Sequence, residues 1–317
     1  MNRCLYCYNE ITKEDQIRQE FHQKCSIKFF GSEIPPKIEY SQSEMQELAK
    51  KVVKSQKTVT GVQPKLSLER KKMTNDSSAE RFTIVGLWGQ YILKPQTELY
   101  KELPEIEDLT MHLAESAKIN TVPHSLIRLR SGELAYITKR VDRLNKRKLH
   151  MEDMCQLTER QTEHKYKGSY EQIAKAINLY SLNPGLDKVN FYELVLYCYL
   201  TGNNDMHLKN FSLLKDENKE YTLSPAYDLV ASELVVEGDD EELALNLNGK
   251  KRKLQKKDFE KAMDISGINQ KAAQNVFSKF KDIKTTWFEI IDVSFLSNEM
   301  KKSYKEILDL KFQLLDE

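Results

Sequence analysis

The stretch "TGNNDMHLKNFSLLKDENKEYTLSPAYDL", residues 201–229, places an Asp, a His, a Lys and an Asn within six residues, between two apolar segments. The preceding "NFYELVLYCYL" is apolar enough to form a buried helix, and Gly202 followed by two Asn residues favours a helix end. "FSLL" and "YTLS" then flank the polar turn "KDENKE", which predicts a β-hairpin. We therefore expect Asn210 and Asp228, at the two ends of this hairpin, to lie close together.

The spacing of Asp205, Asn210 and Asp228 is the arrangement that phosphoryl transfer needs. The first Asp would orient and deprotonate a hydroxyl, while the Asn and the second Asp would hold Mg²⁺ against nucleotide phosphates. Oxygen ligands suit magnesium. A solvated loop that uses Asn and Asp as turn formers is the simpler interpretation of the loop alone. The later Asp and the upstream features described next favour a kinase.

Those upstream features include a strand lysine and acidic helix residues. Lys94 lies in the apolar "QYILKPQ", where a kinase places the lysine that contacts the α- and β-phosphates. Glu107 or Glu105, in the helical "PEIEDLTMHLAES", would pair with it. A solvated lysine and an ordinary acidic first turn are the alternatives. In "KTVTGVQPKLSL" a turn at Gly61 offers backbone N–H groups to phosphates, although it lacks a G-x-G-x-x-G pattern.

Composition excludes several classes of protein. The 317 residues contain 49 Lys and Arg against 48 Asp and Glu, a net charge of +1, so no global field attracts nucleic acid or anionic lipid. No apolar run reaches the length of a spanning helix, and the amino end has no signal-peptide hydrophobic region. We expect a cytosolic protein with no membrane partner. Its five cysteines would then be reduced rather than form a disulfide framework.

The order of patterns along the chain predicts an α+β fold. Residues 1–40 carry cysteines and form a small module, and residues 43–54 have helical periodicity. Strand patterns dominate from 56 to 141, interrupted by one helix from 104 to about 117, and helical patterns follow. We predict a module at 1–40, a β-rich lobe at 41–143 with the ATP-phosphate loop, and an all-α lobe at 144–317 with the catalytic loop.

The amino-terminal module contains a possible metal site. Cys4 and Cys7 form C-x₂-C, and "FHQKC" supplies His22 and Cys25 with two residues between them. Two close pairs of soft or borderline ligands suit tetrahedral zinc, in a segment too small to fold on its own apolar core. Unrelated reduced thiols and a surface His are the alternative. The remaining cysteines, Cys155 and Cys198, lie in apolar helical surroundings and are predicted core residues.

At the family level, the chain resembles the HipA-family serine/threonine kinases, the toxins of bacterial toxin–antitoxin systems. The resemblance rests on "TVTGVQPKLSL", "YILKP", "KRVDR", "MEDMCQL", "GNNDMHLKNFSL" and "LSPAYDL", in family order over roughly residues 45–315. By this resemblance, the chain would lack the small domain that precedes the kinase core of full-length members. In this it is similar to the short HipT-type kinases, whose missing domain is a separate HipS-like protein. The resemblance implies a bilobal fold related to phosphoinositide 3-kinases.

The resemblance also implies roles for individual residues. Asp205 would be the catalytic base, supported by His207 and Lys209, and Asn210 and Asp228 would ligate Mg²⁺, the latter in the context "YDL". The implied ATP-binding residues are Lys94 and its partner Glu107, Gly61 of the phosphate loop, Lys139 and Val141 at the adenine hinge, and Asp142 at the ribose. Since an acidic residue is familiar where Lys139 stands, its hinge contact would be through the backbone.

Regulation and partners are implied in the same way. Thr58 and Thr60 occupy the place of autophosphorylated serines, and a phosphate there would add about −1.5 to −2 charge next to ATP phosphates and disfavour nucleotide binding. The alternative is that both are ordinary β-formers. The implied substrate is an aminoacyl-tRNA synthetase, so translation would be inhibited. An antitoxin or a HipS-like protein would be the partner, and DNA would be contacted only through an antitoxin.

Two other classes of function remain open. Small-molecule phosphotransferases such as aminoglycoside kinases also use an Asp-x₄-Asn loop, but they carry H-G-D, with His before Asp, whereas His207 follows Asp205. A non-catalytic module could contact DNA or an antitoxin through the basic run "KKRKLQKK", residues 250–257. Such runs are usually solvated. A pseudokinase would be expected to have lost Lys94, Asp205, Asn210 or Asp228, and all four are present.

Overall fold

The computed structural model describes residues 2–55, 65–72, 80–85, 88–144, 147–216, 220–236, 238 and 240–316. Its internal contacts divide the chain into two compact units, which are described separately. The first unit comprises residues 1–108, 122–140 and 293–295, and the second comprises residues 109–121, 141–292 and 296–317. Helix α4 (Leu103–Ser116) begins in the first unit and ends in the second.

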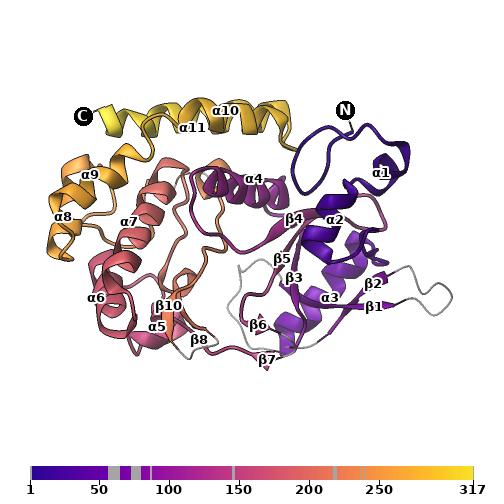
Figure 1. Ribbon diagram of the computed structural model, residues 1–317, viewed down its shortest axis with the longest axis horizontal. Helices are drawn as coiled ribbons and strands as arrows, with labels where there is room; N and C mark the ends of the chain where they lie inside the picture. Colours follow the sequence, from indigo (N-terminus) through magenta and orange to yellow (C-terminus); the bar gives the residue numbers. More distant parts are fainter. Residues whose placement is uncertain are drawn as a thin grey trace. The chain divides into compact units, whose positions relative to one another are not determined.

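The first unit is built on an antiparallel five-stranded sheet with the order β2-β1-β3-β5-β4 (Figure 1). Alternation in β1 buries Leu66 and Leu68, and the strand ends in exposed lysines, the pattern of a strand with one covered face. β3 is the central strand. The strands are β1 (Leu66–Lys72), β2 (Glu80–Ile84), β3 (Tyr91–Pro95), β4 (His124–Arg128) and β5 (Leu134–Lys139).

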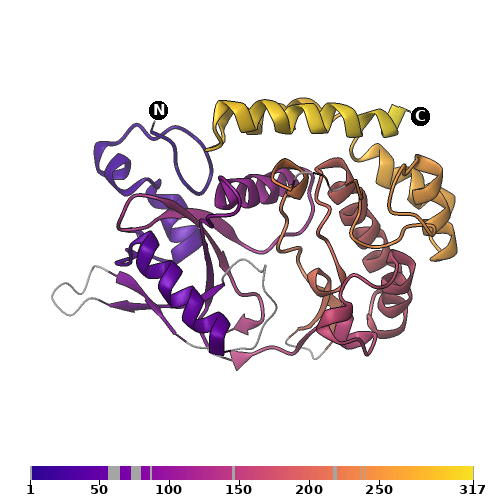
Figure 2. The same ribbon diagram turned by 180° about the vertical axis from the view of Figure 1, so that it is seen from behind.

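Helix α3 (Gln42–Ser55) lies across this sheet and contacts β3 (Figure 2). Met45 on its inner side is fully buried in the core that the strands share. The helical periodicity predicted for residues 43–54 is therefore confirmed, and the strand patterns predicted from 56 to 141 are found as β1 to β5.

The amino-terminal segment contributes to the core of the first unit. It contains α1 (Glu14–Gln19) and α2 (Gln23–Phe30), and α2 ends where Gly31 adopts a left-handed conformation, with φ of 80°. Leu5, Phe21 and Phe29 are buried in one apolar cluster with Leu68 and Leu93 of the sheet. Residues 1–40 thus pack on the strands rather than around a core of their own. The domain boundaries at 40 and 143 remain a prediction.

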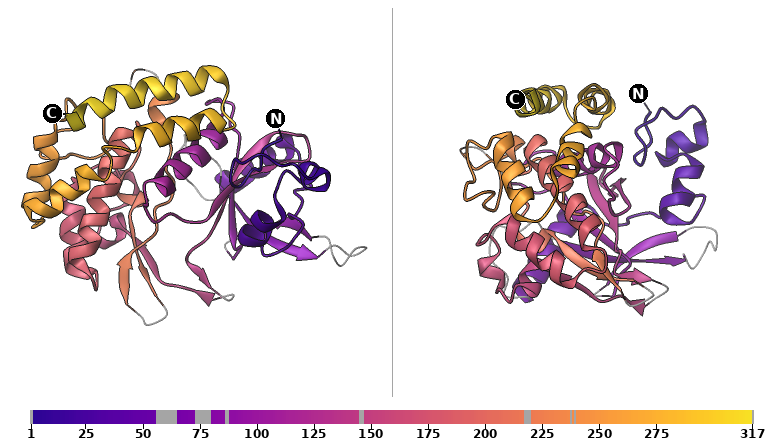
Figure 3. Two further views of the ribbon diagram at one scale, coloured as in Figure 1. Left: turned by 45° about the horizontal axis from the view of Figure 1, so that its top comes forward. Right: turned by 60° about the vertical axis from the view of Figure 1, so that its left-hand side comes forward.

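The second unit is mainly helical, as predicted. In its helix α7, every residue from Phe191 to Leu200 is buried except the half-buried Glu193. Helices α10 and α11 run side by side (Figure 3), with Trp287 of α10 packed edge-on against Phe312 of α11. The helices are α5 (Met154–Leu157), α6 (Tyr170–Tyr180), α7 (Pro184–Leu200), α8 (Lys256–Ile265), α9 (Gln270–Ser278), α10 (Lys284–Val293) and α11 (Asn298–Asp316), with the 3-10 turns η1 (Thr162–His164), η2 (Leu208–Asn210) and η3 (Ser232–Leu234).

Short strands position residues 201–229. The predicted hairpin is β9 (Ser212–Lys215) and β10 (Tyr221–Leu223), and β8 (Met151–Asp153) adds an unpredicted third strand beside β9. A separate pair is formed by β6 (Arg143–Leu144) and β7 (Arg147–Lys148). Across the described part of the chain, no helix combines the length and apolarity needed to span a bilayer.

Candidate functional site

In the loop after α7, Asp205 is exposed while its neighbours are buried or half-buried. Gly202 follows the helix at φ of 65°, and a Cβ there would lie 3.0 Å from the Glu233 side chain, so both the conformation and the tight contact favour glycine. The Asn203 side chain accepts a hydrogen bond from the Asp205 N–H, and the Asn204 N–H donates to Ser232 Oγ at 2.9 Å. Among residues 201–210, Asp205 alone is exposed. These hydrogen bonds hold the backbone of the loop in place, while the Asp205 side chain is exposed to solvent.

The hairpin brings Asn210 and Asp228 together, as predicted. Asn210 Nδ2 lies 3.5 Å from Asp228 Oδ2, and Asn210 Oδ1 accepts from the His207 N–H at 3.2 Å. Asp228 adopts φ of 57°, a left-handed conformation that is uncommon outside glycine but tolerated by Asp and Asn. Uncommon backbone conformations cluster at functional sites, so this conformation adds support for a functional role of Asp228.

The His207 side chain is buried beside the loop and is a weak base at neutral pH. Burial lowers the pKa of His207 to about 4, an effect that the carboxylates of Asp205 and Asp228 only partly oppose. The imidazole is therefore neutral at pH 7. Its ring packs edge-on against Tyr166, with 5.0 Å between ring centroids. His207 is accordingly a packed, neutral support for the loop.

Tyr166 is a site residue that the sequence interpretation missed. Its hydroxyl donates to Asp205 Oδ1 at 2.5 Å, although 39 positions separate the two residues. The backbone beside it is tied to the same loop, because the Leu208 N–H donates to the Lys165 carbonyl at 3.1 Å. The exposed Asp205 carboxylate is thus positioned to accept a hydrogen bond from a hydroxyl group. A Tyr in "HKYKG" carries no local pattern that would have indicated this contact.

Lys209 connects the loop to the junction of strand β8 and helix α5. Its Nζ donates to Asp153 Oδ2 at 2.7 Å, and the Tyr227 hydroxyl donates to its carbonyl at 3.0 Å. Asp153 also begins α5 with a capping box in which Asp153 and Gln156 exchange hydrogen bonds. The D-x-x-Q spacing in "MEDMCQL" was a readable sign of this helix start, and the sequence interpretation did not use it.

Within the first unit, Lys94 and Glu107 form a buried ion pair. Lys94 is 3% exposed on the central strand, Glu107 is fully buried on α4, and Lys94 Nζ also lies 5.3 Å from the centre of the Tyr136 ring. Of the two glutamates considered from sequence, Glu107 is the one in the ion pair. Burial raises the pKa of the other, Glu105, to about 7. An unpaired charge in the protein interior is strongly destabilising, so the ion pair holds the side chains of Lys94 and Glu107 in place.

The residues predicted to contact adenine and ribose lie on either side of the division between the units. In the first unit, Lys139 ends β5, its N–H donates to the Pro123 carbonyl, and burial lowers its pKa. In the second unit, Asp142 follows Val141 and forms an ion pair with Arg143. The predicted phosphate-loop glycine, Gly61, and the predicted autophosphorylation sites Thr58 and Thr60 lie outside the described residues.

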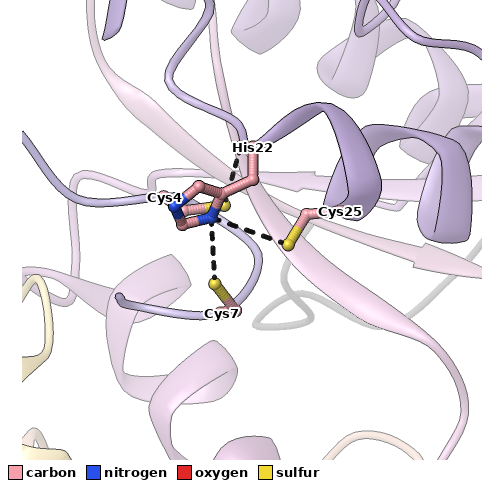
Figure 4. Close-up of side chains that lie close together, drawn as sticks. All are labelled: Cys4, Cys7, His22 and Cys25. Atoms are coloured by element: carbon pink, nitrogen blue, oxygen red, sulfur yellow. Dashed lines mark hydrogen bonds between the residues drawn. The ribbon is translucent and has the colours of Figure 1, made fainter. Parts of the chain in front are cut away.

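In the first unit, the predicted zinc ligands converge. Each of Cys4, Cys7, His22 and Cys25 offers a ligand atom, and these atoms all lie within 4.8 Å of one another (Figure 4). The prediction that the other two cysteines are core residues is confirmed, since Cys155 and Cys198 are 2% and 0% exposed, whereas zinc binding stays a prediction.

Three of the six cations in the basic run 250–257 form ion pairs within their own unit. Lys250 pairs with Asp258 at 2.9 Å, and Lys251 pairs with Glu241 at 2.9 Å. Arg252 forms an ion pair with Asp240. Paired cations attract a polyanion less strongly than free ones, so this run gives little support to a DNA-binding module.

Comparison with known proteins decides the family. The family model of the HipA-like C-terminal domain matches residues 57–287. The chain belongs to this HipA-like family. A Haemophilus influenzae protein named "Putative kinase" is 30% identical over 251 residues, which are 73% of this chain and 68% of that protein. A Sinorhizobium fredii protein, "Putative kinase Y4dM", is 32% identical over 209 residues, 62% of this chain and 49% of the relative.

Two solved structures show that the HipA-like chain has a kinase fold. A chain from the Shewanella oneidensis MR-1 toxin–antitoxin complex of HipA, HipB and operator DNA matches with a TM-score of 0.66 and 22% identity, over 82% of this chain and 65% of that one. The Helicobacter pylori proinflammatory kinase CtkA matches with a TM-score of 0.53 and 16% identity, over 78% and 90% of the two chains. The predicted fold class is therefore confirmed. The chain spans about half to two thirds of the length of several proteins it matches.

Proposed function

We propose that this HipA-like protein is an ATP-dependent kinase that phosphorylates serine or threonine hydroxyls of a protein. The observation that carries the proposal is that the loop of the exposed Asp205, together with the hairpin that follows it, brings Asn210 beside Asp228 and the His207 N–H. The buried Lys94–Glu107 pair supports it, because kinases use such a strand-lysine and helix-glutamate pair. Relatives named as kinases support it further.

Asn210 and Asp228 fit a magnesium site. Amide and carboxylate oxygens are magnesium ligands, and Asp228 is held at an uncommon backbone conformation beside Asn210. When bound, Mg²⁺ would neutralise charge on the ATP phosphates. Asn210 is oriented by the His207 N–H, so its side chain is already fixed by the loop.

Asp205 would act as the base. Its exposed carboxylate accepts the proton of the attacking hydroxyl, whose oxygen takes the γ-phosphoryl group while ADP leaves. Lys209 would position the loop through Asp153 rather than touch the reacting atoms. The neutral His207 would support the same loop.

The remaining predicted residues would bind ATP. Lys94, oriented by Glu107, would contact the α- and β-phosphates, and backbone N–H groups near Gly61 would contribute. The backbone of Lys139 and Val141 would meet adenine, and Asp142 would accept from the ribose. The proposal therefore requires the Asp142 carboxylate to accept a hydrogen bond from the ribose while it also forms its ion pair with Arg143.

The substrate and partners are proposed from the family. In its specific form, the proposal is that this protein is the toxin of a toxin–antitoxin system and phosphorylates an aminoacyl-tRNA synthetase. Its partner would be an antitoxin or a HipS-like protein. Its support is the fold match to a chain of a complex that also contains HipB and operator DNA. Any contact with DNA would then be made through the antitoxin.

Autophosphorylation at Thr58 or Thr60 is the proposed means of self-regulation. Intact mass spectrometry of the active protein and of Asp205→Asn tests it: a phosphate within residues 55–65 of the active form only, with weakened ATP binding, supports the switch. Active protein that carries no phosphate there, or full phosphate with normal ATP binding, would show that both threonines are structural.

The Tyr166 hydroxyl should compete with a substrate hydroxyl for the base. Because Tyr166 donates to Asp205 Oδ1, substrate must displace a hydrogen bond of about 1 kcal/mol, so Tyr166→Phe should raise kcat/KM for the protein substrate by roughly 3- to 10-fold. The KM for ATP should stay unchanged. Steady-state kinetics against each substrate in turn measures both effects. A fall in kcat/KM would show instead that Tyr166 positions the base.

The reaction itself is tested with γ-labelled ATP, Mg²⁺ and an extract divided into protein and small-molecule fractions. A protein kinase labels the protein fraction on serine or threonine. Label in the small-molecule fraction alone would identify a small-molecule phosphotransferase and overturn the proposal. Absence of transfer to either fraction would favour a non-catalytic module.

A further inference from the structure

The amino-terminal segment contains four side chains arranged as the ligands of one ion. Cys4 and Cys7 come from the first turn of the chain, His22 from the residue before α2, and Cys25 from the first turn of α2. In Figure 4 His22 Nδ1 points at Cys7 Sγ and Cys25 Sγ, at 3.4 and 3.8 Å. With all ligand atoms within 4.8 Å of one another, their spacing fits a tetrahedral ion with Zn–S bonds near 2.3 Å and Zn–N bonds near 2.0–2.1 Å.

The other ring nitrogen of His22 fixes which nitrogen faces the sulfurs. Nε2 lies 3.1 Å from the Glu10 carbonyl oxygen, which can only accept a hydrogen bond, so Nε2 carries the proton. Nδ1 then presents its lone pair to the sulfur atoms. Metal-bound histidines usually have their second nitrogen engaged in this way with a carbonyl or carboxylate.

The sulfurs themselves receive hydrogen bonds. The His22 N–H donates to Cys4 Sγ at 3.4 Å, and Asn9 Nδ2 donates to Cys7 Sγ at 3.6 Å. Donors directed at sulfur stabilise thiolates, the form that binds metal. All three cysteines are free of disulfides, and Cys4 and Cys25 are buried. A single Nδ1 lone pair can accept well from only one thiol S–H, whereas a metal ion accounts for the convergence of three sulfurs on it.

We propose that Cys4, Cys7, His22 and Cys25 bind one Zn²⁺ in a closed structural site that fastens the amino-terminal segment to the sheet and to α4. Three thiolates and an imidazole favour zinc over magnesium or calcium, which prefer oxygen. Four protein ligands leave no position for substrate, so the ion has no catalytic role.

Two contacts connect the knuckle formed by Cys4–Cys7 to the sheet and helix. The Leu126 N–H of β4 donates to the Leu5 carbonyl at 3.2 Å, which ties the knuckle to the sheet edge. The Tyr8 hydroxyl, next to Cys7, donates to Asp108 Oδ2 at 2.7 Å, and Asp108 Oδ1 lies 2.7 Å from His124 Nδ1. Asp108 is adjacent to Glu107 on α4. The ion would therefore stabilise the helix that carries the partner of Lys94.

Without a metal ion, few interactions within the amino-terminal segment would stabilise its fold. Its helices have six and eight residues, and helices this short are marginal without tertiary packing. Its apolar side chains do pack on the sheet, so we expect loss of zinc to loosen the knuckle and the first turns of α4 rather than unfold the second unit.

Metal content is the first test. Protein prepared without chelator should contain one zinc per chain by elemental analysis, and Co²⁺ in its place should give thiolate charge-transfer absorption. Cys7→Ser should lose the zinc, whereas the matched control Cys155→Ser, at a buried cysteine of the second unit, should retain it. If Cys7→Ser does not fold, thiol modification of the wild type should still release one zinc. Absence of zinc from the wild type, or a different metal in its place, would overturn the proposal.

Hydrogen exchange tests the structural role without relying on activity. Removal of zinc should increase exchange at least several-fold in residues 2–30 and 103–108, while α7 and α11 stay protected. Tyr8→Phe should keep one zinc but increase exchange in 103–108, because it breaks only the link to Asp108. Unchanged exchange in 103–108 on zinc removal would refute the coupling to α4. Any effect on phosphate transfer rests on the proposed function, whereas zinc binding and exchange are measured independently of it.

Discussion

Asp228→Ala should reduce phosphate transfer by about 100-fold or more. The substitution removes a carboxylate that we propose as a magnesium ligand, and losses of this size are typical when a group that stabilises transition-state charge is deleted. Alanine at φ of 57° also strains the backbone by roughly 1–2 kcal/mol, so Asp228→Asn is the companion variant, since Asn tolerates this conformation. Initial rates across a Mg²⁺ titration measure the effect, and both variants should be inactive.

The matched control for this substitution is Asp216→Ala. Asp216 follows β9 of the same hairpin, where its Oδ1 accepts from the Glu220 N–H at 2.9 Å. We expect transfer to remain within a few-fold of wild type. Undiminished transfer by Asp228→Ala would exclude Asp228 as a required metal ligand and, with it, the proposed mechanism.

Lys94→Met should cost both stability and nucleotide binding. It leaves the Glu107 carboxylate buried without its cation, and breaking a buried pair typically costs about 3–5 kcal/mol. Because Lys94 is also the proposed phosphate ligand, ATP affinity should fall sharply. Denaturant unfolding and ATP titration measure the two effects separately.

The double variant Lys94→Met/Glu107→Gln separates packing from function. Removing both charges should recover much of the lost free energy of unfolding, since no buried charge remains unpaired. ATP binding should not recover. Restored stability together with wild-type ATP affinity would show that the pair is structural and that Lys94 does not bind phosphate.

Local patterns were sufficient to predict most of the fold. Apolar periodicity indicated α3 and α4, and turn chemistry indicated the β9–β10 hairpin, from which the approach of Asn210 to Asp228 follows. The strand β8 was missed because three residues carry too little alternation, and its pairing with β9 depends on tertiary contacts.

Contacts between distant residues account for the site features that the sequence did not reveal. Tyr166 meets Asp205 from 39 positions away, and Lys209 meets Asp153 from 56. The Cys/His spacing predicted which four side chains would converge, but nothing local indicated that Tyr8 would reach Asp108, 100 positions on. Pairings of this kind depend on how helices and strands pack, which periodicity does not encode.

The central claim is that Asp205 is the base of a protein kinase, and phosphoproteomics after brief induction tests it most directly. Cells expressing the wild type are compared with cells expressing Asp205→Asn, which keeps the shape of the side chain but not its basicity. The account predicts new phosphoserine or phosphothreonine sites on one or a few proteins in the wild-type cells alone. Identical phosphopeptides in the two cultures, or the same new sites in both, would contradict it.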